Sequence, residues 1–326
     1  MKALTYSQYG GPEVVQITEV APPTPGPDQI LIRVHASAVN TGDWRIRAAA
    51  FPGIMAIPGR LMFGPLRPRN RRLGSEFAGV VEKVGASVSR FKEGDRVFGM
   101  MPMGGATAEY LAIGETSAVA RMPASLSFEN AAGMPFGGLC ALVFLGEYAA
   151  LKPGHRLLIV GASGGVGAFA VQVAKALGAH VTAVSGPESQ DFAAGLGADE
   201  TVDYKTTNIA TLGQRFEVVF DTFGAVTPKM SRDLLVEGGL FLPLNFGLLE
   251  IGAALLNRFK SRKIRLAVNP DHMEDMERFA QMVEEGAVRP VVDNIYPMKE
   301  AAQAHRRVES RHKRGAVVLR IVDQTE

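Results

Sequence analysis

Cysteine and aromatic residues are scarce in this sequence. Its 326 residues include one cysteine, Cys140, and one tryptophan, and aromatic residues make up 7% of the chain. One thiol cannot form a disulfide within the chain, so nothing in the sequence supports secretion into an oxidising environment. With so few aromatic side chains, the base-stacking half of an RNA-binding surface is missing as well.

The sequence also lacks an excess of one charge. Its 35 basic and 33 acidic residues give a net charge of +2, which is too small to indicate a polyanionic partner, so nucleic acid is not expected. No basic and then apolar leader opens the chain, and we expect the cytoplasm as its compartment. Residues 157–174 run without a charge for nearly the length of a membrane span. Because this stretch holds four glycines, we expect a strand, a turn and a buried helix there, and no membrane partner.

What is present is a pattern that divides the chain into two domains. Short runs of branched residues, separated by Gly, Pro and Asp, indicate a β-rich first part that forms a barrel or sandwich. These runs cover residues 14–17, 29–34, 77–84 and 95–98. Residues 129–148 are helix-like and begin after Ser127, a possible helix cap. We expect the first domain at 1–125, completed by strand-like runs within 288–326, and the second at 126–287.

The second part alternates between strand-like and helix-like segments. Strands are expected at residues 157–160, 180–184, 218–220, 240–242 and 264–268. Helices are expected between them, at residues 166–177, 189–196 and 228–236. Such alternation predicts an α/β fold with a doubly wound parallel sheet covered on both faces.

A glycine-rich turn, Gly161-Ala162-Ser163-Gly164-Gly165-Val166-Gly167, follows the first of these strands and opens a helix. This context is typical of a dinucleotide site, where Gly164 lets the backbone approach a pyrophosphate and Gly167 lets the helix pack closely on the strand. The phosphates would lie at the helix N-terminus, where free N–H groups favour anions. A tight turn that binds nothing is the alternative.

The end of the next strand indicates which nucleotide is held. An NAD site usually places an acidic residue about there to bind the ribose 2′-hydroxyl. Here Ser185 and Gly186 leave room for a 2′-phosphate, and Lys205 is the nearest basic candidate, although Glu188 lies close by. We therefore predict NADPH in preference to NADH.

Several motifs, in their order along the chain, resemble the medium-chain dehydrogenase/reductase superfamily, in its zinc-free quinone oxidoreductase-like branch. These motifs are Ser37-Ala38-Val39-Asn40-Thr41-Gly42-Asp43, Leu73-Gly74-Ser75-Glu76-Phe77-Ala78-Gly79, Gly94-Asp95-Arg96-Val97-Phe98-Gly99, the glycine turn, and Leu196-Gly197-Ala198-Asp199 followed by Tyr204. The resemblance covers essentially the whole chain. It implies a GroES-like domain beside a Rossmann domain, with the active site between them.

The resemblance also bears on metal. The zinc-dependent branch has a Cys ligand at the position of Asn40, a His at the position of Ser75 and a third ligand near Phe136. Glu76 and Asp43 remain, but two carboxylates without soft ligands make a poor zinc site. We predict no zinc. Hydride transfer to a quinone or an activated C=C bond then becomes the expected chemistry, with hydrogen-bond donors stabilising the oxygen that gains charge.

The resemblance implies roles for three residues of one loop. Asn40 would orient the nicotinamide or the substrate, or else be a turn residue. Asp43 would accept hydrogen bonds there, or bind backbone structurally. Arg45 stands where relatives often have tyrosine, which favours a polar or anionic substrate.

Further positions match the family's cofactor contacts, and Cys140 matches one unless it is simply a buried small side chain. The expected cofactor-binding residues are Asn40, Cys140, Ser163, Gly164, Gly165, Val166, Gly167, Ser185, Gly186, Tyr204, Phe223, Leu244, Asn245 and Arg314.

An arginine-rich loop lies between the two N-terminal motifs, with Arg60, Arg67, Arg69, Arg71 and Arg72 among three prolines. We expect it at the cleft edge or purely on the surface. If it held a phosphopantetheine arm, the protein would be an enoyl-thioester reductase; a non-catalytic nucleotide-sensing or RNA-binding protein is a third hypothesis. Relatives commonly dimerise, and the edge strand expected at 264–268 could pair across a two-fold axis.

Overall fold

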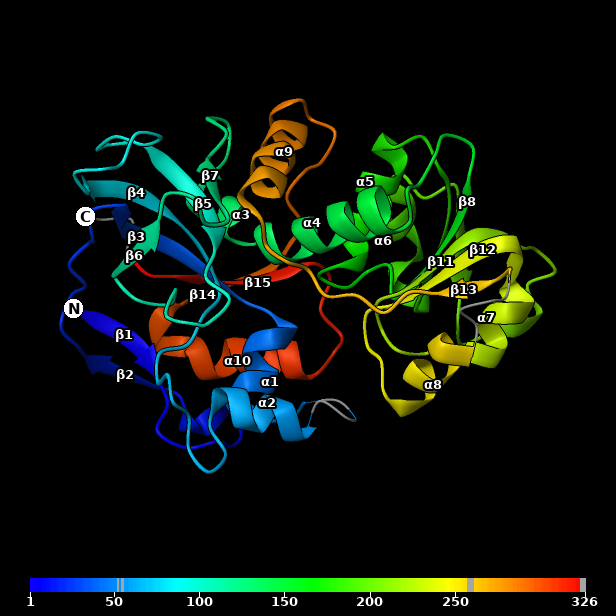
Figure 1. Ribbon diagram of the computed structural model, residues 1–326, viewed down its shortest axis with the longest axis horizontal. Helices are drawn as coiled ribbons and strands as arrows, with labels where there is room; N and C mark the ends of the chain where they lie inside the picture. The colour runs from blue at the N-terminus through cyan, green and yellow to red at the C-terminus, as the bar shows by residue number, and fades with distance from the viewer. Residues whose placement is uncertain (52, 54–55, 257–260, 323–326) are drawn as a thin grey trace.

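Two β-sheets lie side by side in the computed structural model, which describes residues 1–51, 53, 56–256 and 261–322 (Figure 1). The N-terminal sheet has the strand order β14-β15-β3-β4-β5-β7, with β6 paired to β3, and β1 and β2 form a separate pair. The strands are β1 (Lys2–Thr5), β2 (Gln16–Glu19), β3 (Gln29–Val39), β4 (Glu76–Val84), β5 (Arg96–Met100), β6 (Tyr110–Gly114), β7 (Val119–Arg121), β14 (Val292–Pro297) and β15 (Ala316–Arg320).

The C-terminal strand returns to this N-terminal sheet. β15 pairs antiparallel with β3, with Val317 opposite Val39. On this pairing we propose the division that the sequence suggested, 1–125 with 288–326 and 126–287.

The second sheet is parallel throughout and has the order β10-β9-β8-β11-β12-β13. Its strands are β8 (Arg156–Val160), β9 (His180–Ser185), β10 (Glu200–Asp203), β11 (Phe216–Asp221), β12 (Leu235–Pro243) and β13 (Lys263–Ile264). Leu157 and Ile159 of β8 pack into one apolar cluster, and Leu158 and Val160 into another. Both faces are thus buried, which explains why the strand is continuously apolar.

The helices expected around the second sheet are present with small shifts at their ends. They are α5 (Gly167–Ala176), α6 (Gln190–Gly195) and α7 (Pro228–Leu234). The remaining helices are α1 (Thr41–Ala48), α2 (Ala56–Phe63), α3 (Phe128–Ala132), α4 (Pro135–Leu142), α8 (Leu248–Leu256), α9 (Met273–Glu284) and α10 (Ala301–Glu309). No helix in the described part of the chain has the length and apolar character needed to cross a bilayer.

Three expectations need correction. The helix-like stretch 129–148 is broken into α3, α4 and a π-helical turn (Val143–Tyr148), because Pro135 cannot continue a helix and starts a new one. Arg60 lies on α2 and not in a loop. The strand expected at 264–268 ends at Ile264, because β13 is an edge strand with β12 as its one neighbour in the described ranges.

Helix α4 connects the two halves and fixes the cleft between them. Seven of its eight residues are buried, and one apolar cluster reaches from Phe98 of β5 through Leu139 of α4 to Phe220 of β11. A Cβ on Gly138 would lie 2.0 Å from the ring of Phe279 of α9, so only glycine permits this close packing. Helix α4 therefore packs against both sheets at once.

Candidate active site

A cavity of about 340 Å³ lies between the two sheets. One wall comes from the loop after β3 and from β4, and the other from the carboxyl ends of parallel strands, where α/β folds bind ligands. The expected site residues that line it are Asn40, Arg45, Cys140, Gly164, Gly165, Val166, Phe223, Leu244 and Asn245. Ser163, Gly167, Ser185, Gly186, Tyr204, Arg314 and Asp43 are outside this lining.

The glycine turn forms the floor of the cavity at the start of α5. Gly161 has φ +84°, and a Cβ on Gly167 would lie 2.1 Å from the carbonyl oxygen of Gly161. A Cβ on Gly164, in contrast, would meet nothing closer than 3.4 Å. Gly167 is thus required for helix packing, whereas Gly164 lines the cavity.

The end of β9 forms a second, more open part of the site. Ser185 is buried, and its hydroxyl accepts a hydrogen bond from Gln190 Nε2 at 2.9 Å. A Cβ on Gly186 would be 3.5 Å from the ring of Tyr204, which is half exposed. Tyr204 therefore lies against Gly186 with one side of its ring free.

A basic side chain reaches this end of the site from a distant part of the chain. Arg314 Nε donates to Ser189 Oγ at 3.2 Å, and Arg314 Nη2 donates to the Glu188 carbonyl at 2.5 Å. Lys205, which the sequence offered for this role, is exposed, and its backbone N–H donates to Asp203 Oδ1. Arg314 thus supplies the cation that the sequence around Ser185 lacks.

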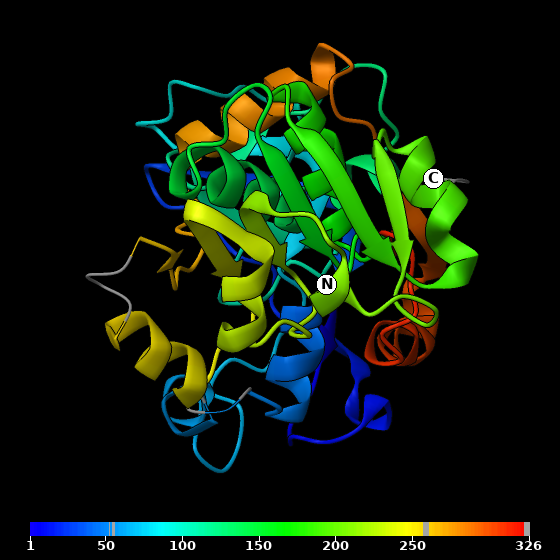
Figure 2. The same ribbon diagram turned by 90° about the vertical axis from the view of Figure 1, so that its right-hand side faces the viewer.

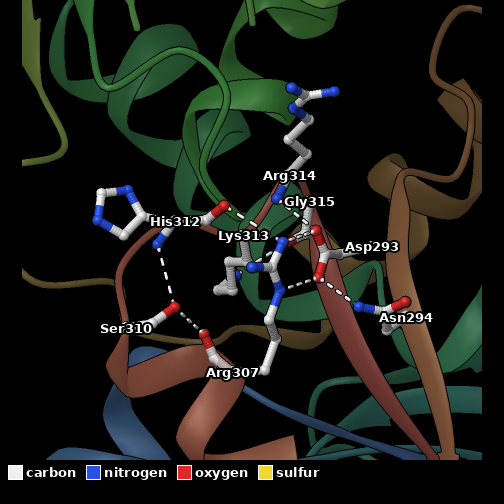
Figure 3. Close-up of polar contacts among 8 residues, drawn as sticks. All are labelled: Asp293, Asn294, Arg307, Ser310, His312, Lys313, Arg314 and Gly315. Carbon is white, nitrogen blue, oxygen red and sulfur yellow. Dashed lines mark hydrogen bonds and ion pairs between the residues drawn. The ribbon is translucent and has the colours of Figure 1, made fainter. Parts of the chain in front are cut away.

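Asp293 holds the C-terminal turn that carries Arg314 (Figure 3). Its carboxylate accepts hydrogen bonds from Arg307 Nε at 2.7 Å, Arg307 Nη2 at 2.8 Å and the Arg314 backbone N–H at 2.8 Å. Although burial raises its pKa, these donors lower the pKa of Asp293 below its ordinary value. Gly315 N–H donates to the carbonyl of Ser163, so this turn is attached directly to the glycine turn.

The same C-terminal turn places two further cations along the cleft. Arg311 lies over the ring of Phe223, 4.1 Å from its centroid, and donates to the Phe223 carbonyl. Lys313 Nζ donates to the Gly315 carbonyl at 2.6 Å and would be 2.6 Å from a Cβ on Gly165. Burial lowers the pKa of Lys313 to about 8, although Glu76 and Asp293 oppose that shift. One turn therefore carries three cations, with Arg314 near the end of β9, Lys313 at the glycine turn and Arg311 near the end of β11.

Asn40 joins a buried polar network on the opposite wall. Its Nδ2 donates to Ser75 Oγ at 2.8 Å and to Glu76 Oε2 at 2.9 Å. Glu76 Oε1 accepts the Phe136 backbone N–H at 2.9 Å. Burial raises the pKa of Glu76 to about 7, against the hydrogen bonds from Asn40 and Phe136. Both amide protons of Asn40 are therefore directed at protein atoms and not at the cavity.

Asp43 makes hydrogen bonds to backbone, which is the structural alternative to the catalytic role that the resemblance implies for it. Its Oδ2 accepts the Asn40 N–H at 2.9 Å while its own N–H donates to Asn40 Oδ1, a reciprocal cap on α1. Asp43 is buried and does not line the cavity, and burial raises its pKa to about 7. It positions Asn40 and makes no contact with the cavity.

These residues do not fit a zinc ion. The resemblance places the ligands of the zinc-dependent branch at Asn40, Ser75 and Phe136. Here Asn40 donates hydrogen bonds to Ser75 and Glu76, and the Phe136 backbone N–H donates to Glu76. In the described ranges no group of three or more His, Cys, Asp or Glu side chains could hold a metal. Zinc requires lone pairs, preferably from thiolate or imidazole, at these points.

Arg45 and Cys140 line the cavity in different ways. Arg45 Nη2 donates across the cleft to Asn245 Oδ1 at 2.8 Å, and burial and the nearby Arg311 lower the pKa of Arg45. Cys140 is buried, which raises the pKa of its thiol and keeps it protonated. Arg45 can therefore meet an anion, whereas Cys140 offers only a small apolar surface.

The arginines between residues 60 and 72 do not line the cavity. Four of them are exposed and Arg72 is partly buried, in agreement with the expectation of a surface or cleft-edge position. The sequence reasoning missed Lys313 and Arg311. Both lie in the same basic turn as Arg314, just before β15. This turn is far from the glycine turn in sequence, so no local pattern connects the two.

Comparisons with known proteins cover the whole chain. The family profile of the alcohol dehydrogenase GroES-like domain matches residues 26–159, and that of zinc-binding dehydrogenases matches residues 196–319. A chloroplastic quinone-oxidoreductase homolog of Spinacia oleracea is 33% identical over 98% of each chain. The quinone oxidoreductase of Pseudomonas aeruginosa is 33% identical over 98% of this chain and 99% of its own.

Solved structures agree with this result. The quinone oxidoreductase of Coxiella burnetii superposes with a TM-score of 0.87 at 27% identity, covering 99% of both chains. The Escherichia coli quinone oxidoreductase, solved in complex with NADPH, gives a TM-score of 0.82 at 28% identity over 98% of this chain and 100% of its own. The α/β fold with a GroES-like domain and a parallel Rossmann sheet is thereby confirmed. Because one relative is chloroplastic, a cytoplasmic location stays a prediction.

Proposed function

Because the chain belongs to the medium-chain dehydrogenase/reductase superfamily, in its quinone oxidoreductase-like branch, we propose that it is a zinc-independent, NADPH-dependent reductase of quinones or α,β-unsaturated carbonyl compounds. One observation carries the proposal. The cavity has the glycine turn and Lys313 on one side and a polar network without a zinc ligand set on the other. Bound NADPH supplies a hydride.

NADPH is favoured over NADH by the end of β9. No acidic residue ends this strand to bind a ribose 2′-hydroxyl, since Ser185 and Gly186 stand there. Arg314 brings a guanidinium to Ser189, beside these residues, and such a group suits a phosphate. Glu188, whose carboxylate lies 3.9 Å from Arg314, is highly exposed and can turn away.

The glycine turn and Lys313 are suited to the pyrophosphate. No side chain caps the N-terminus of α5, which leaves it open to an anion, and the ammonium of Lys313 lies against Gly165. Because Lys313 is partly buried, water screens its attraction for phosphate less than at an exposed site.

Arg45 is the residue that we assign to the substrate oxygen. Hydride addition to a quinone or an enone places negative charge on that oxygen, and a cation in a cavity with little water stabilises it. Arg45 lines the cavity, and its present partner, Asn245, is a neutral amide that a substrate oxygen can replace. Asn40, Asp43 and Glu76 act as positioning residues that keep the opposite wall rigid.

The test measures oxidation of NADPH by the purified protein with quinones, enals and enones, beside NADH and enoyl-CoA esters. We expect turnover with quinones or enones, a lower KM for NADPH than for NADH, and no loss of activity after dialysis against a chelator. If none of these acceptors leads to oxidation of NADPH, the proposal of a reductase is contradicted. A requirement for added zinc would contradict the metal-free site, and a strong preference for enoyl-CoA would indicate the thioester alternative.

We also propose a homodimer formed through the open edge of β13, which pairs only with β12 among the strands that the structure describes. Light scattering after size-exclusion chromatography measures this directly, and a monomer at micromolar concentration would refute it.

A further inference from the structure

Two helices beside the cleft expose several large apolar side chains. Helix α8 buries none of its nine residues, and α2 buries only Gly59. The side chains concerned are each more than half exposed. They are Ile57, Leu61 and Met62 of α2, Leu66 after it, and Leu248, Leu249, Leu255 and Leu256 of α8. An apolar surface of this extent is unusual on a soluble monomer and indicates an interaction site.

The two helices lie at the same end of the cleft. A Cβ on Gly53, just before α2, would be 3.3 Å from the Cα of Gly247, just before α8. Phe246, which precedes Gly247, lines the cavity. Figures 1 and 2 both show α2 and α8 along the lower edge of the molecule. We call the exposed apolar residues of this edge, with the arginines next to them, the mouth surface.

Basic residues predominate among the charged residues near these apolar side chains. Arg60, Arg67, Arg69 and Arg71 are exposed, and no acidic residue occurs between positions 44 and 75. Beyond α8, Lys263 is exposed as well. The only acidic residue of α8 is Glu250, and its carboxylate accepts the Gly247 N–H at 2.7 Å. Apolar side chains next to arginines, with Glu250 as the one acid on the two helices, are a combination that suits an anionic membrane surface.

We propose that the mouth surface docks on an anionic phospholipid bilayer, with the leucines of α8 and the apolar side chains of α2 at the acyl boundary and the arginines on headgroup phosphates. A second copy of the chain fits less well, because a two-fold contact would bring the same arginines together. The docked orientation turns the cleft toward the bilayer, from which an apolar quinone or enone can enter. That consequence rests on the proposed function, whereas binding to the bilayer does not.

The experiment is co-sedimentation of the full chain with vesicles of phosphatidylcholine alone or mixed with phosphatidylglycerol. We expect binding to the mixed vesicles that weakens at least roughly fivefold when salt is raised from low to physiological concentration, and little binding to phosphatidylcholine alone. Binding that is absent from both, or equal on both, would overturn the proposal.

Two double variants assign the contact to the mouth surface. Leu249→Glu with Leu255→Glu, and separately Arg67→Glu with Arg69→Glu, should each reduce vesicle binding at least roughly tenfold. The matched charge control is Lys83→Glu with Lys92→Glu, at exposed positions in and after β4, on the side of the molecule away from α2 (Figure 1). Ile295→Ser is the control for an exposed apolar side chain elsewhere. Controls and variants that bind equally would contradict the assignment.

Hydrogen exchange of the unaltered protein gives a second measurement that does not depend on variants. Vesicles should protect the amides of α2 and α8 and leave those of β4 and β5 unchanged. If the Leu249→Glu, Leu255→Glu variant instead dissociates a dimer, while vesicles protect neither helix, the mouth surface is a subunit interface and the proposal is wrong. NADPH oxidation without vesicles tests the proposed function separately.

Discussion

Asn40 lies where the resemblance implies a catalytic role, yet the hydrogen bonds of its side chain all go to other protein groups. Both of its amide protons go to Ser75 and Glu76, and its Oδ1 accepts the N–H of Asp43. The network contains no thiolate or imidazole, the ligands that zinc prefers, and its two carboxyl groups have raised pKa values because they are buried.

The raised pKa of Asp43 predicts a pH-dependent cost to stability. Its pKa is about 7 in the folded protein and near 4 when unfolded, so between these values the folded state binds more protons and the free energy of unfolding falls as pH rises. Asp43→Asn keeps the hydrogen bond to Asn40 N–H and removes the titration. The stability of this variant relative to the unaltered protein should therefore rise by about 1–3 kcal/mol from pH 4.5 to pH 7.5. Thermal melts across this range measure it; a constant difference would contradict the assignment.

The position of Arg314 predicts that its removal raises the KM for NADPH more than the KM for NADH. Arg314→Ala should raise the KM for NADPH roughly tenfold, since a charge-assisted hydrogen bond to phosphate contributes about 1.5–3 kcal/mol, and leave the KM for NADH almost unchanged. Lys205→Ala is the matched control and should change neither constant. Steady-state kinetics with both cofactors decide between the two cations, and a larger effect at Lys205 would restore the expectation from sequence.

At the scale of the element, the glycine turn separates two roles of glycine. A Cβ on Gly167 would overlap the Gly161 carbonyl, whereas a Cβ on Gly164 would make only an ordinary van der Waals contact, 3.4 Å from the same oxygen. The packing of α5 on β8 requires the first glycine, and we propose that the second is required by the cofactor.

Two alanine substitutions should therefore have opposite effects. Gly167→Ala should destabilise the fold by about 1–3 kcal/mol or more through overpacking. Gly164→Ala should leave the melting temperature nearly unchanged and weaken NADPH binding at least roughly tenfold, because the methyl group occupies the space of the phosphates. Melting curves and fluorescence titration with NADPH separate the two outcomes. Equal losses of stability would show that Gly164 is also a packing residue.

At the scale of the whole molecule, the C-terminal turn links the two sheets through the cofactor site. Its strand, β15, belongs to the N-terminal sheet, yet Gly315 is hydrogen-bonded to Ser163 of the glycine turn. Asp293, on β14, holds this connection in place through Arg307 and the Arg314 backbone.

Removal of the contacts that hold the C-terminal turn should lower the affinity for both cofactors. Asp293→Asn removes the charge opposite Arg307 and should lower stability by about 1–3 kcal/mol. The affinities for NADPH and NADH should fall by similar factors, unlike the selective effect at Arg314. Asp199→Asn is the control, because it breaks an ion pair with Lys175 that lies outside the cavity lining. A loss confined to NADPH would show that Asp293 acts only through Arg314.

The sequence by itself determined the parallel sheet, the glycine turn and the absence of soft ligands at Asn40 and Ser75. These features are local, since strand pattern, turn chemistry and ligand type are all written in short stretches of residues. Tertiary structure decided which distant groups meet: Arg314 instead of Lys205 at the end of β9, Lys313 over Gly165, and Asp43 turned inward to cap α1. It also decided that α2 and α8 stay uncovered, because exposure depends on what the rest of the chain leaves unpacked, and no local pattern contains that information.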